Sequence, residues 1–254
     1  MRLRGKVAIV TGSSKGIGKA IALKLASEGA CVVINQEPIK SLSENVVSEI
    51  IKTGGKAIYY DADISVKKDV YAMIDHTISK YNRLDIMVAN AGICPFQEYH
   101  EIDENTLDRV IDINQKGAFY CAQYSAQKMK ELNIRGRLIF ISSISAVFGG
   151  KSQVHYCGTK GAVNQMMKSF AIALGEYGIT SNSIQPGTVL TDINKDSFNA
   201  NPELLKYFVN RTPIGRLATP IDVANGVCFY ATEEAACISG TSLTIDGGMS
   251  VNLQ

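Results

Sequence analysis

Short apolar runs alternate along the chain with longer stretches in which apolar residues recur at helical spacing. The short runs are rich in β-branched residues and nearly all apolar, so they predict strands that helices cover on both faces. A strand followed by a helix, repeated from one end of the chain to the other, is typical of βαβ units. The predicted strands are residues 7–11, 31–35, 57–61, 85–90, 138–142, 180–185 and 242–246.

The longer stretches predict helices between these strands. We therefore expect an α/β fold of the Rossmann type, a doubly wound parallel sheet of about seven strands with helices on both faces. No linker or repeat divides residues 1–254, so we expect a single domain. Residues 187–216, rich in Asn, Asp, Thr and Pro, predict a lid at the substrate site. The predicted helices are 17–29, 41–54, 66–81, 104–131, 154–177 and 220–232.

Composition and charge argue against several classes of partner. Lys and Arg number 26 against 24 Asp and Glu, and this near balance gives no reason to expect a nucleic acid or an anionic membrane. The apolar runs are too short to span a bilayer, and the first residues pass directly into a strand pattern unlike a signal peptide. The six cysteines form no C-x-x-C pair, so we expect free thiols in the cytoplasm and no bound metal.

The segment VTGSSKGIG, residues 10–18, joins the first predicted strand to the first predicted helix. Glycines at 12, 16 and 18 allow a tight turn and a close approach of the backbone to a pyrophosphate at the helix N-terminus. The spacing G-x-x-x-G-x-G departs from the usual dinucleotide fingerprint, and such turns also occur for packing reasons alone. Its place at the first strand–helix junction favours cofactor binding.

Three further features follow later strands. Asp63 either accepts a hydrogen bond from an adenine amino group or caps the helix that begins near Ser65. The tight turn ANAG, residues 89–92, allows a ribose to approach, and PGTVLT, residues 186–191, offers backbone groups and Thr191 to a nicotinamide carboxamide. All of these features lie at predicted carboxyl ends of strands, where open α/β sheets bind ligands.

In HYCGTKGA, residues 155–162, Tyr156 and Lys160 are four apart and share a helix face. An isolated pair of this kind is usually a surface pair without function. Here it occurs with TGSSKGIG, ANAG, Asn114, Ser143 and the Pro-Gly pair at 186–187, in this order. On these residues the sequence closely resembles the short-chain dehydrogenase/reductase family over essentially its whole length. It departs from the family at Ala89, usually Asn, and at Gly158-Thr159, often Ala-Ser.

The resemblance implies hydride transfer to a nicotinamide, with four catalytic residues. Tyr156 is the base for the carbinol proton, and shifting a phenol pKa from ~10 to ~7 requires about 4 kcal/mol. We expect Lys160 and the nicotinamide charge to supply it. Ser143 would bind the substrate oxygen, and Asn114 would anchor a water that joins Lys160 to solvent; the alternative for Asn114 is a polar residue that bends the helix. The residues expected to contact the cofactor are Gly12, Ser14, Lys15, Gly16, Ile17, Gly18, Gln36, Glu37, Asp63, Ile64, Asn90, Ala91, Gly92, Tyr156, Lys160, Pro186, Gly187, Val189 and Thr191.

The choice between NADP and NAD rests on opposed signals. Lys15 is placed to meet a 2′-phosphate and favours NADP. Gln36 stands where NAD enzymes of the family commonly have Asp, whereas Glu37 beside it would repel a phosphate if it pointed inward. We expect NADP as the main cofactor, with some use of NAD.

The substrate side has a narrower resemblance. NAGICPF (90–96), SSISAVFGG (142–150), PGTVLTDINK (186–195) and DGGMSVNLQ (246–254) resemble the sugar 1-dehydrogenases of this family. This implies oxidation of an L-rhamnose-like aldose at C1 to the lactone. The alternatives are a 3-oxoacyl-carrier-protein reductase, which shares the catalytic residues, and a non-catalytic dinucleotide-binding regulator, which would not need Tyr156 or Lys160. The residues expected to bind the sugar are Ser143, Ser145, Gln153, Thr191 and Asn194.

Two predicted helices, 104–131 and 154–177, carry more apolar residues than one core-facing stripe requires. In the family, the equivalent helices build a four-helix interface, so we expect a homotetramer. The alternative is that these residues belong to an ordinary core. They are Phe119, Met166, Met167 and Phe170.

Overall fold

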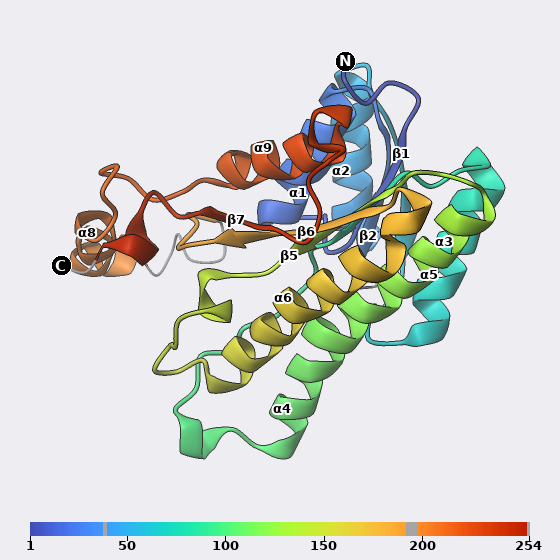
Figure 1. Ribbon diagram of the computed structural model, residues 1–254. Coiled ribbons are helices and arrows are strands. Elements are labelled where there is room, and N and C mark those ends of the chain that lie inside the picture. The colour runs from blue at the N-terminus through green and yellow to red at the C-terminus, as the bar shows by residue number, and fades with distance from the viewer. Residues whose placement is uncertain (38–39, 192–197, 253–254) are drawn as a thin grey trace.

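The protein is built on one seven-stranded parallel sheet (Figure 1). The computed structural model describes residues 1–37, 40–191 and 198–252, and within them the strand order is β3-β2-β1-β4-β5-β6-β7. Every neighbouring pair is parallel, which confirms the predicted doubly wound fold. The strands are β1 (Val7–Val10), β2 (Cys31–Gln36), β3 (Lys56–Asp61), β4 (Ile86–Ala89), β5 (Arg137–Ile141), β6 (Thr180–Pro186) and β7 (Ser242–Ile245).

Helices cover both faces of the sheet, as the apolar strands require. Successive residues of a strand point to opposite faces, so Ala8 and Val10 of β1 join one core cluster and Ile9 joins the other. The first face is covered by α1 (Gly16–Ser27), α2 (Lys40–Lys52) and α9 (Pro220–Ala231). The second is covered by α3 (Lys67–Tyr81), α5 (Ala118–Glu131) and α6 (Val154–Leu174) (Figure 1).

The helix predicted over residues 104–131 is helical along its whole length, but its middle is not α-helical. It consists of α4 (Glu104–Ile111), a π-helical turn at Asp112–Gly117, and α5. A π-helical turn is a wider turn inside a helix, and the helical period continues on each side of it. Gly117 in this turn packs so closely on the β3–α3 connection that a Cβ there would lie 2.9 Å from the carbonyl oxygen of Ile64. The absence of a side chain at Gly117 therefore lets this turn pack against the connection.

The stretch predicted as a lid contains a helix that the sequence reading did not predict. Helix α8 (Pro202–Asn210) begins after Asn201, whose side chain accepts a hydrogen bond from the Leu204 amide at 3.1 Å. It lies away from the sheet, near the C-terminus of the chain (Figure 1). Residues 192–197, which include the sugar-binding candidate Asn194, lie outside the described residues. Short 3₁₀ turns occur at Tyr99–Glu101, Ile144–Ala146, Gly175–Tyr177, Glu233–Ala235 and Met249–Val251.

The apolar residues predicted for an interface separate into two groups. Met167 is fully buried in the second core cluster, so it cannot contribute to a surface, and the sequence prediction was wrong for this residue. Phe119, Met166 and Phe170 are only half-buried and line an apolar groove of about 340 Å³ between α5 and α6. In the described part of the chain, no helix has both the length and the hydropathy to cross a membrane.

Candidate active site

The glycine loop lies between β1 and α1, at the carboxyl edge of the sheet. Gly12 and Gly16 have φ angles of 61° and 55°, in the left-handed region that favours glycine. Gly18 is needed for a different reason, since a Cβ there would overlap the carbonyl oxygen of Gly12 and lie 2.5 Å from Asn90 Nδ2. The loop is thus packed tightly on the turn that follows β4.

The residues of this loop fit a dinucleotide pyrophosphate. Helix α1 begins at Gly16, Lys15 precedes it without a side-chain cap, and its first turn contains no acidic residue. Amide donors and the helix dipole at this end therefore favour an anion. Asn90 stabilises the arrangement, because its Nδ2 donates to the carbonyl oxygens of Thr11 and Gly12 at 2.8 and 3.1 Å. Thr11 Oγ1 in turn accepts from the amides of Asn90 and Ala91.

Asn35 connects the carboxyl ends of β1, β2 and β3, a role that the sequence analysis did not predict. Its fully buried side chain donates to the carbonyl oxygens of Tyr60 and Ala62 and accepts from the Gly12 amide at 3.4 Å. One side chain thus links the ends of three strands. The neighbouring residue, Gln36, accepts a hydrogen bond from Ser14 Oγ at 2.6 Å. A buried Asn at the end of an apolar strand was the only sequence signal for this role.

Asp63 does not cap α3, which begins at Lys67, so the capping alternative is wrong. Its Oδ1 accepts from the amide and hydroxyl of Ser65, and its Oδ2 accepts from Arg109 of α4 at 3.3 Å. Burial raises the pKa of Asp63, but the hydrogen bonds from Ser65 and Arg109 outweigh it and lower the pKa below its usual value. Arg109 also donates to Glu37 at 2.6 Å. The sequence reading gave Arg109 no role.

Tyr156 and Lys160 lie in the first turns of α6, with Lys160 Nζ 5.5 Å from the centre of the Tyr156 ring. Lys160 is buried and donates to the carbonyl oxygen of Ile141 at 2.8 Å. Burial lowers the pKa of Lys160 to about 8. Burial has the opposite effect on Tyr156, because it disfavours the charged phenolate, and it raises the pKa of Tyr156 to about 12 although a hydrogen bond with Ser143 lowers it. The lowered phenol pKa expected from the sequence is thus not a property of these side chains alone.

Asn114 connects the turn after β4 to α6. Asn114 lies in the π-helical turn. Its Oδ1 accepts from the Ile93 amide at 2.8 Å, and its Nδ2 donates to the Ile93 carbonyl oxygen and to Thr159 Oγ1. Gly92 allows this approach, since a Cβ there would lie 3.2 Å from Asn114 Oδ1 and 3.4 Å from Lys160 Nζ. The side chain predicted to anchor a water is therefore already engaged with protein groups, close to Lys160.

The described candidates for sugar binding do not form one cluster. Ser143 Oγ accepts from the Ser145 amide at 3.0 Å, and Gln153 Nε2 donates to Cys94 Sγ at 3.1 Å. Thr191 lies nearer the cofactor loop, since a Cβ at Gly16 would come within 4.0 Å of its Cγ2. Among the residues predicted to contact the cofactor, Ile64 and Val189 bury their side chains in the two core clusters, and Ile17 is half-buried against the first of them.

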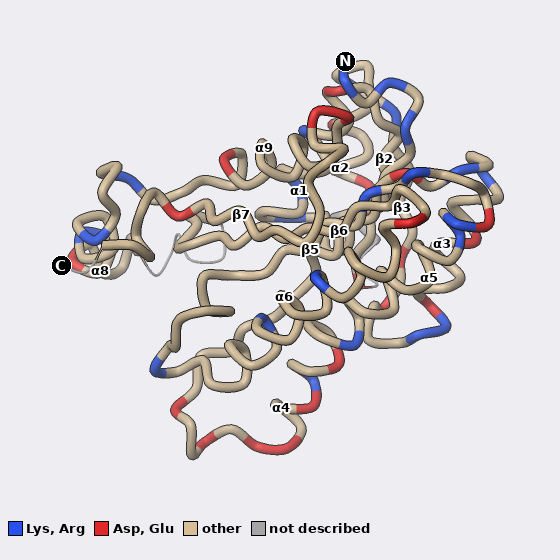
Figure 2. The backbone as a smooth tube through the Cα atoms, in the orientation of Figure 1, with Lys and Arg blue, Asp and Glu red and all other residues tan. Residues whose placement is uncertain are grey.

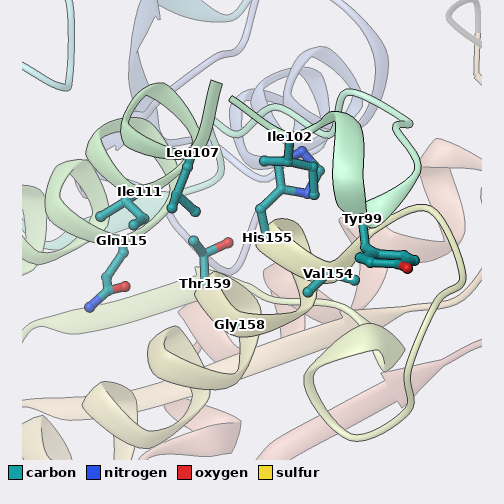
Figure 3. A pocket seen from close by; sticks show the side chains of 9 residues that line it. All are labelled: Tyr99, Ile102, Leu107, Ile111, Gln115, Val154, His155, Gly158 and Thr159. Carbon is teal, nitrogen blue, oxygen red and sulfur yellow. The ribbon is translucent and has the colours of Figure 1, made fainter. Parts of the chain in front are cut away.

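One described pocket lies beside the Tyr156–Lys160 pair without including it. A pocket of about 490 Å³ lies between α4 and α6, and its lining includes His155, Gly158 and Thr159 but neither Tyr156 nor Lys160 (Figure 3). The ring nitrogens of His155 are buried there without a hydrogen-bond partner.

Charges of both signs are interspersed along the chain (Figure 2). The segment that leads into α4 is acidic, with Glu98, Glu101, Asp103 and Glu104. Among the described residues, no three His, Cys, Asp or Glu side chains lie together as metal ligands would.

Comparison with known proteins gives concordant matches. A family model described as enoyl-(acyl carrier protein) reductase matches residues 12–250. The chain is 41% identical over 252 residues to an L-rhamnose 1-dehydrogenase (NAD(P)(+)) of Sphingomonas sp. strain SKA58, covering 99% of both chains. It is 41% identical over 251 residues to an L-rhamnose 1-dehydrogenase (NADP(+)) of Thermoplasma acidophilum, covering 99% and 98%. A short-chain type dehydrogenase/reductase from Mycobacterium marinum superposes with a TM-score of 0.91 at 30% identity, covering 97% of this chain and 96% of that one.

Proposed function

Because the chain belongs to the short-chain dehydrogenase/reductase family and is an NAD(P)-dependent oxidoreductase, we propose that it oxidises an aldose at C1 to the lactone. The proposed substrate is L-rhamnose or a sugar of similar configuration. The observation that carries this choice is 41% identity along nearly the whole chain to two proteins named L-rhamnose 1-dehydrogenase. The polar side chains of Ser143, Ser145 and Gln153 also suit a substrate with several hydroxyls.

In the proposed mechanism, Tyr156 Oη takes the proton of the anomeric hydroxyl while the C1–H bond releases a hydride. C1 then becomes the carbonyl carbon of the lactone. Ser143 Oγ accepts from the Ser145 amide, and its own proton, which is shared with Tyr156 before substrate binds, would turn to the substrate oxygen. Ser145 and Gln153 are the proposed contacts of the other hydroxyls. When bound, the oxidised nicotinamide supplies the hydride acceptor and a positive charge.

The phenol needs help to act as a base near neutral pH. Lowering its pKa from about 12 to ~7 corresponds to about 7 kcal/mol of preferential stabilisation of the phenolate. Protonated Lys160, one helical turn away, and the charge of the bound nicotinamide are the proposed sources. This requirement exceeds the amount estimated from the sequence alone because burial first raises the phenol pKa.

We propose NADP as the preferred cofactor, with NAD as a weaker one. Lys15 is exposed at the N-terminus of α1, where a 2′-phosphate is within reach of a long cation. The two relatives above carry NAD(P)(+) and NADP(+) in their names, which supports use of the phosphorylated form.

The test is a comparison under identical conditions of L-rhamnose and D-glucose with NADP⁺ and of an acetoacetyl thioester with NADPH, followed by nicotinamide absorbance. We expect rapid oxidation of L-rhamnose. Deoxy analogues that lack a recognised hydroxyl should lose kcat/KM by up to roughly 10⁴-fold. Rapid thioester reduction with negligible sugar oxidation would instead identify a 3-oxoacyl-carrier-protein reductase.

That second candidate retains one argument in its favour, since the matching family model is described by an acyl-carrier-protein reaction. Against it stands the acidic segment before α4, which would repel an acidic carrier that approached this end of α6. Binding of the dinucleotide without turnover of any substrate would point to the third candidate, a non-catalytic regulator.

A further inference from the structure

Arg109 joins two carboxylates at the ends of neighbouring strands. Its guanidinium donates to Glu37 Oε1 at 2.6 Å, just after β2, and to Asp63 Oδ2 at 3.3 Å, just after β3. A third bond, at 3.1 Å, goes to Ser65 Oγ. Strands β2 and β3 are paired as far as Gln36 and Asp61, so the two carboxylates lie side by side at the carboxyl edge of the sheet. Arg109 lies on α4, more than forty positions from Asp63 in the sequence.

The position of this bridge points to the adenosine end of the cofactor site. Gln36, beside Glu37, is bonded to Ser14 of the glycine loop at 2.6 Å, and Asn35 is bonded to Gly12. Without Arg109, the carboxylates of Glu37 and Asp63 would lie at this end without the cation that pairs with both of them. With Arg109, part of their negative charge is compensated. The bridge thus reduces the repulsion that Glu37 would exert on a phosphate.

We propose that Arg109 is a specificity-determining residue, which favours the 2′-phosphorylated dinucleotide by neutralising Glu37 and by offering its remaining donors to the phosphate. A guanidinium has five N–H donors in a planar fork, and the bonds to Glu37, Asp63 and Ser65 leave some of them available. This proposal rests on the dinucleotide-dependent function proposed above but not on the sugar substrate.

The local structure holds Arg109 in place without depending on it. Helix α4 begins after Asp103, which accepts from the Thr106 amide at 2.7 Å, and the following π-helical turn packs Gly117 on Ile64. The side chains of Arg109 and Glu37 are 41% and 55% exposed, so their ion pair contributes little to the stability of the fold. Substitutions at Arg109 should therefore leave the protein folded. Thermal unfolding of each variant is the control for this.

The experiment measures dissociation constants for NADPH and NADH by nicotinamide fluorescence, without any sugar. Arg109→Gln should weaken NADPH binding about 10- to 100-fold, the range for loss of a hydrogen bond to a charged group. NADH binding should change by less than about threefold. Arg109→Lys, which keeps the charge but loses the fork, should lie between wild type and Arg109→Gln. The matched control is Arg211→Gln, an arginine at the C-terminal cap of α8 whose side chain donates to Tyr207 Oη instead.

A second substitution tests the role of the carboxylate. Adding Glu37→Gln to Arg109→Gln should restore part of the NADPH affinity, because the unpaired charge is removed. If the ratio of the NADPH and NADH dissociation constants is unchanged in Arg109→Gln, the proposal is overturned. Equal weakening of both nucleotides is one such result, and it would show that Arg109 only orders Asp63. Absence of rescue would overturn the neutralisation of Glu37. Normal dinucleotide binding without sugar oxidation would refute the sugar assignment alone, whereas a wild-type protein that binds neither nucleotide would refute both proposals.

Discussion

Tyr156 is the residue on which the proposed chemistry depends most directly. Tyr156→Phe removes the proton acceptor and keeps the ring, so we expect kcat to fall by at least about 10²–10⁴-fold, the usual contribution of a positioned acid–base group. NADPH affinity, measured by fluorescence, should stay nearly unchanged. A variant that retained most of its kcat would refute the mechanism.

Lys160 should lower the stability of the fold as well as support catalysis. Its pKa is lowered from 10.5 to about 8, so burial of its charge destabilises the fold fully below pH 8, and this effect disappears as pH rises toward 10.5. This pKa difference corresponds to about 3 kcal/mol of destabilisation. A substitution at Lys160 should recover less than this amount, because it also removes the hydrogen bond to Ile141. Lys160→Met should therefore unfold at higher urea concentration than wild type at pH 7, with a smaller difference at pH 9.5.

The control for this measurement is Lys168→Met, an exposed lysine on the same helix, which should leave stability almost unchanged at both pH values. Lys160→Met should also lose turnover. If Lys160→Met were destabilised equally at both pH values, its bond to Ile141 and its packing, rather than its buried charge, would dominate.

At the residue scale, local motifs were informative and distant contacts were not. Ser143, Tyr156 and Lys160 were proposed from short segments of sequence that resemble a known family, and their roles remain predictions. Asn35 and Arg109 act on groups more than twenty positions away, such as Ala62 and Glu37. No spacing rule connects such residues, because only the order of the strands in the sheet brings them together.

The strand–helix turn at the glycine loop gives a prediction at the scale of the element. Gly18→Ala should abolish measurable dinucleotide binding and destabilise the fold, because the added Cβ overlaps the backbone of Gly12 and must displace the start of α1. Fluorescence titration with NADPH and thermal unfolding would measure both effects.

Gly158→Ala is the matched control. Gly158 lies inside α6 between the catalytic residues, with no atom within 4 Å of the added Cβ. Alanine is favoured over glycine within a helix, so this variant should be more stable by about 0.5–1 kcal/mol and bind NADPH normally. Tolerance of Gly18→Ala, or damage by Gly158→Ala, would contradict this account of the loop.

Element boundaries were predictable where one hydrophobic period persists. Strands such as β1 and β5 are wholly buried, and their apolar runs were sufficient to place them. The π-helical turn at Asp112–Gly117 escaped prediction because both flanking helices keep the helical period. Helix α8 escaped because Asn201-Pro202 suggested a loop, although Asn before Pro also suits a helix start.

At the scale of the whole molecule, the order of elements alone was enough to predict the fold. Parallel strands need crossover helices, and right-handed crossovers allow few arrangements of seven strands. The arrangement of side chains on the substrate side was harder to predict from the sequence. Gln153 is paired with Cys94, and Ser143 with the Ser145 amide, through loop conformations that the sequence pattern does not specify.

The groove between α5 and α6 supports the proposal that the protein is a homotetramer. Phe119 and Phe170 lie with ring centres 5.8 Å apart and leave apolar surface exposed beside Met166. Covering such a surface with the same helices of a second copy would bury it symmetrically. We expect sedimentation at micromolar concentration to show a tetramer.

Ala173→Arg tests which surface is used. Ala173 is exposed and lines the groove, so an arginine there adds charge to the proposed interface without removing a core contact. This variant should sediment as a smaller species. Ile172→Arg adds the same charge to the adjacent position, which is 86% exposed and does not line the groove, and it should remain tetrameric. A monomeric wild-type protein would instead show that the half-buried side chains of α5 and α6 are the edge of an ordinary core.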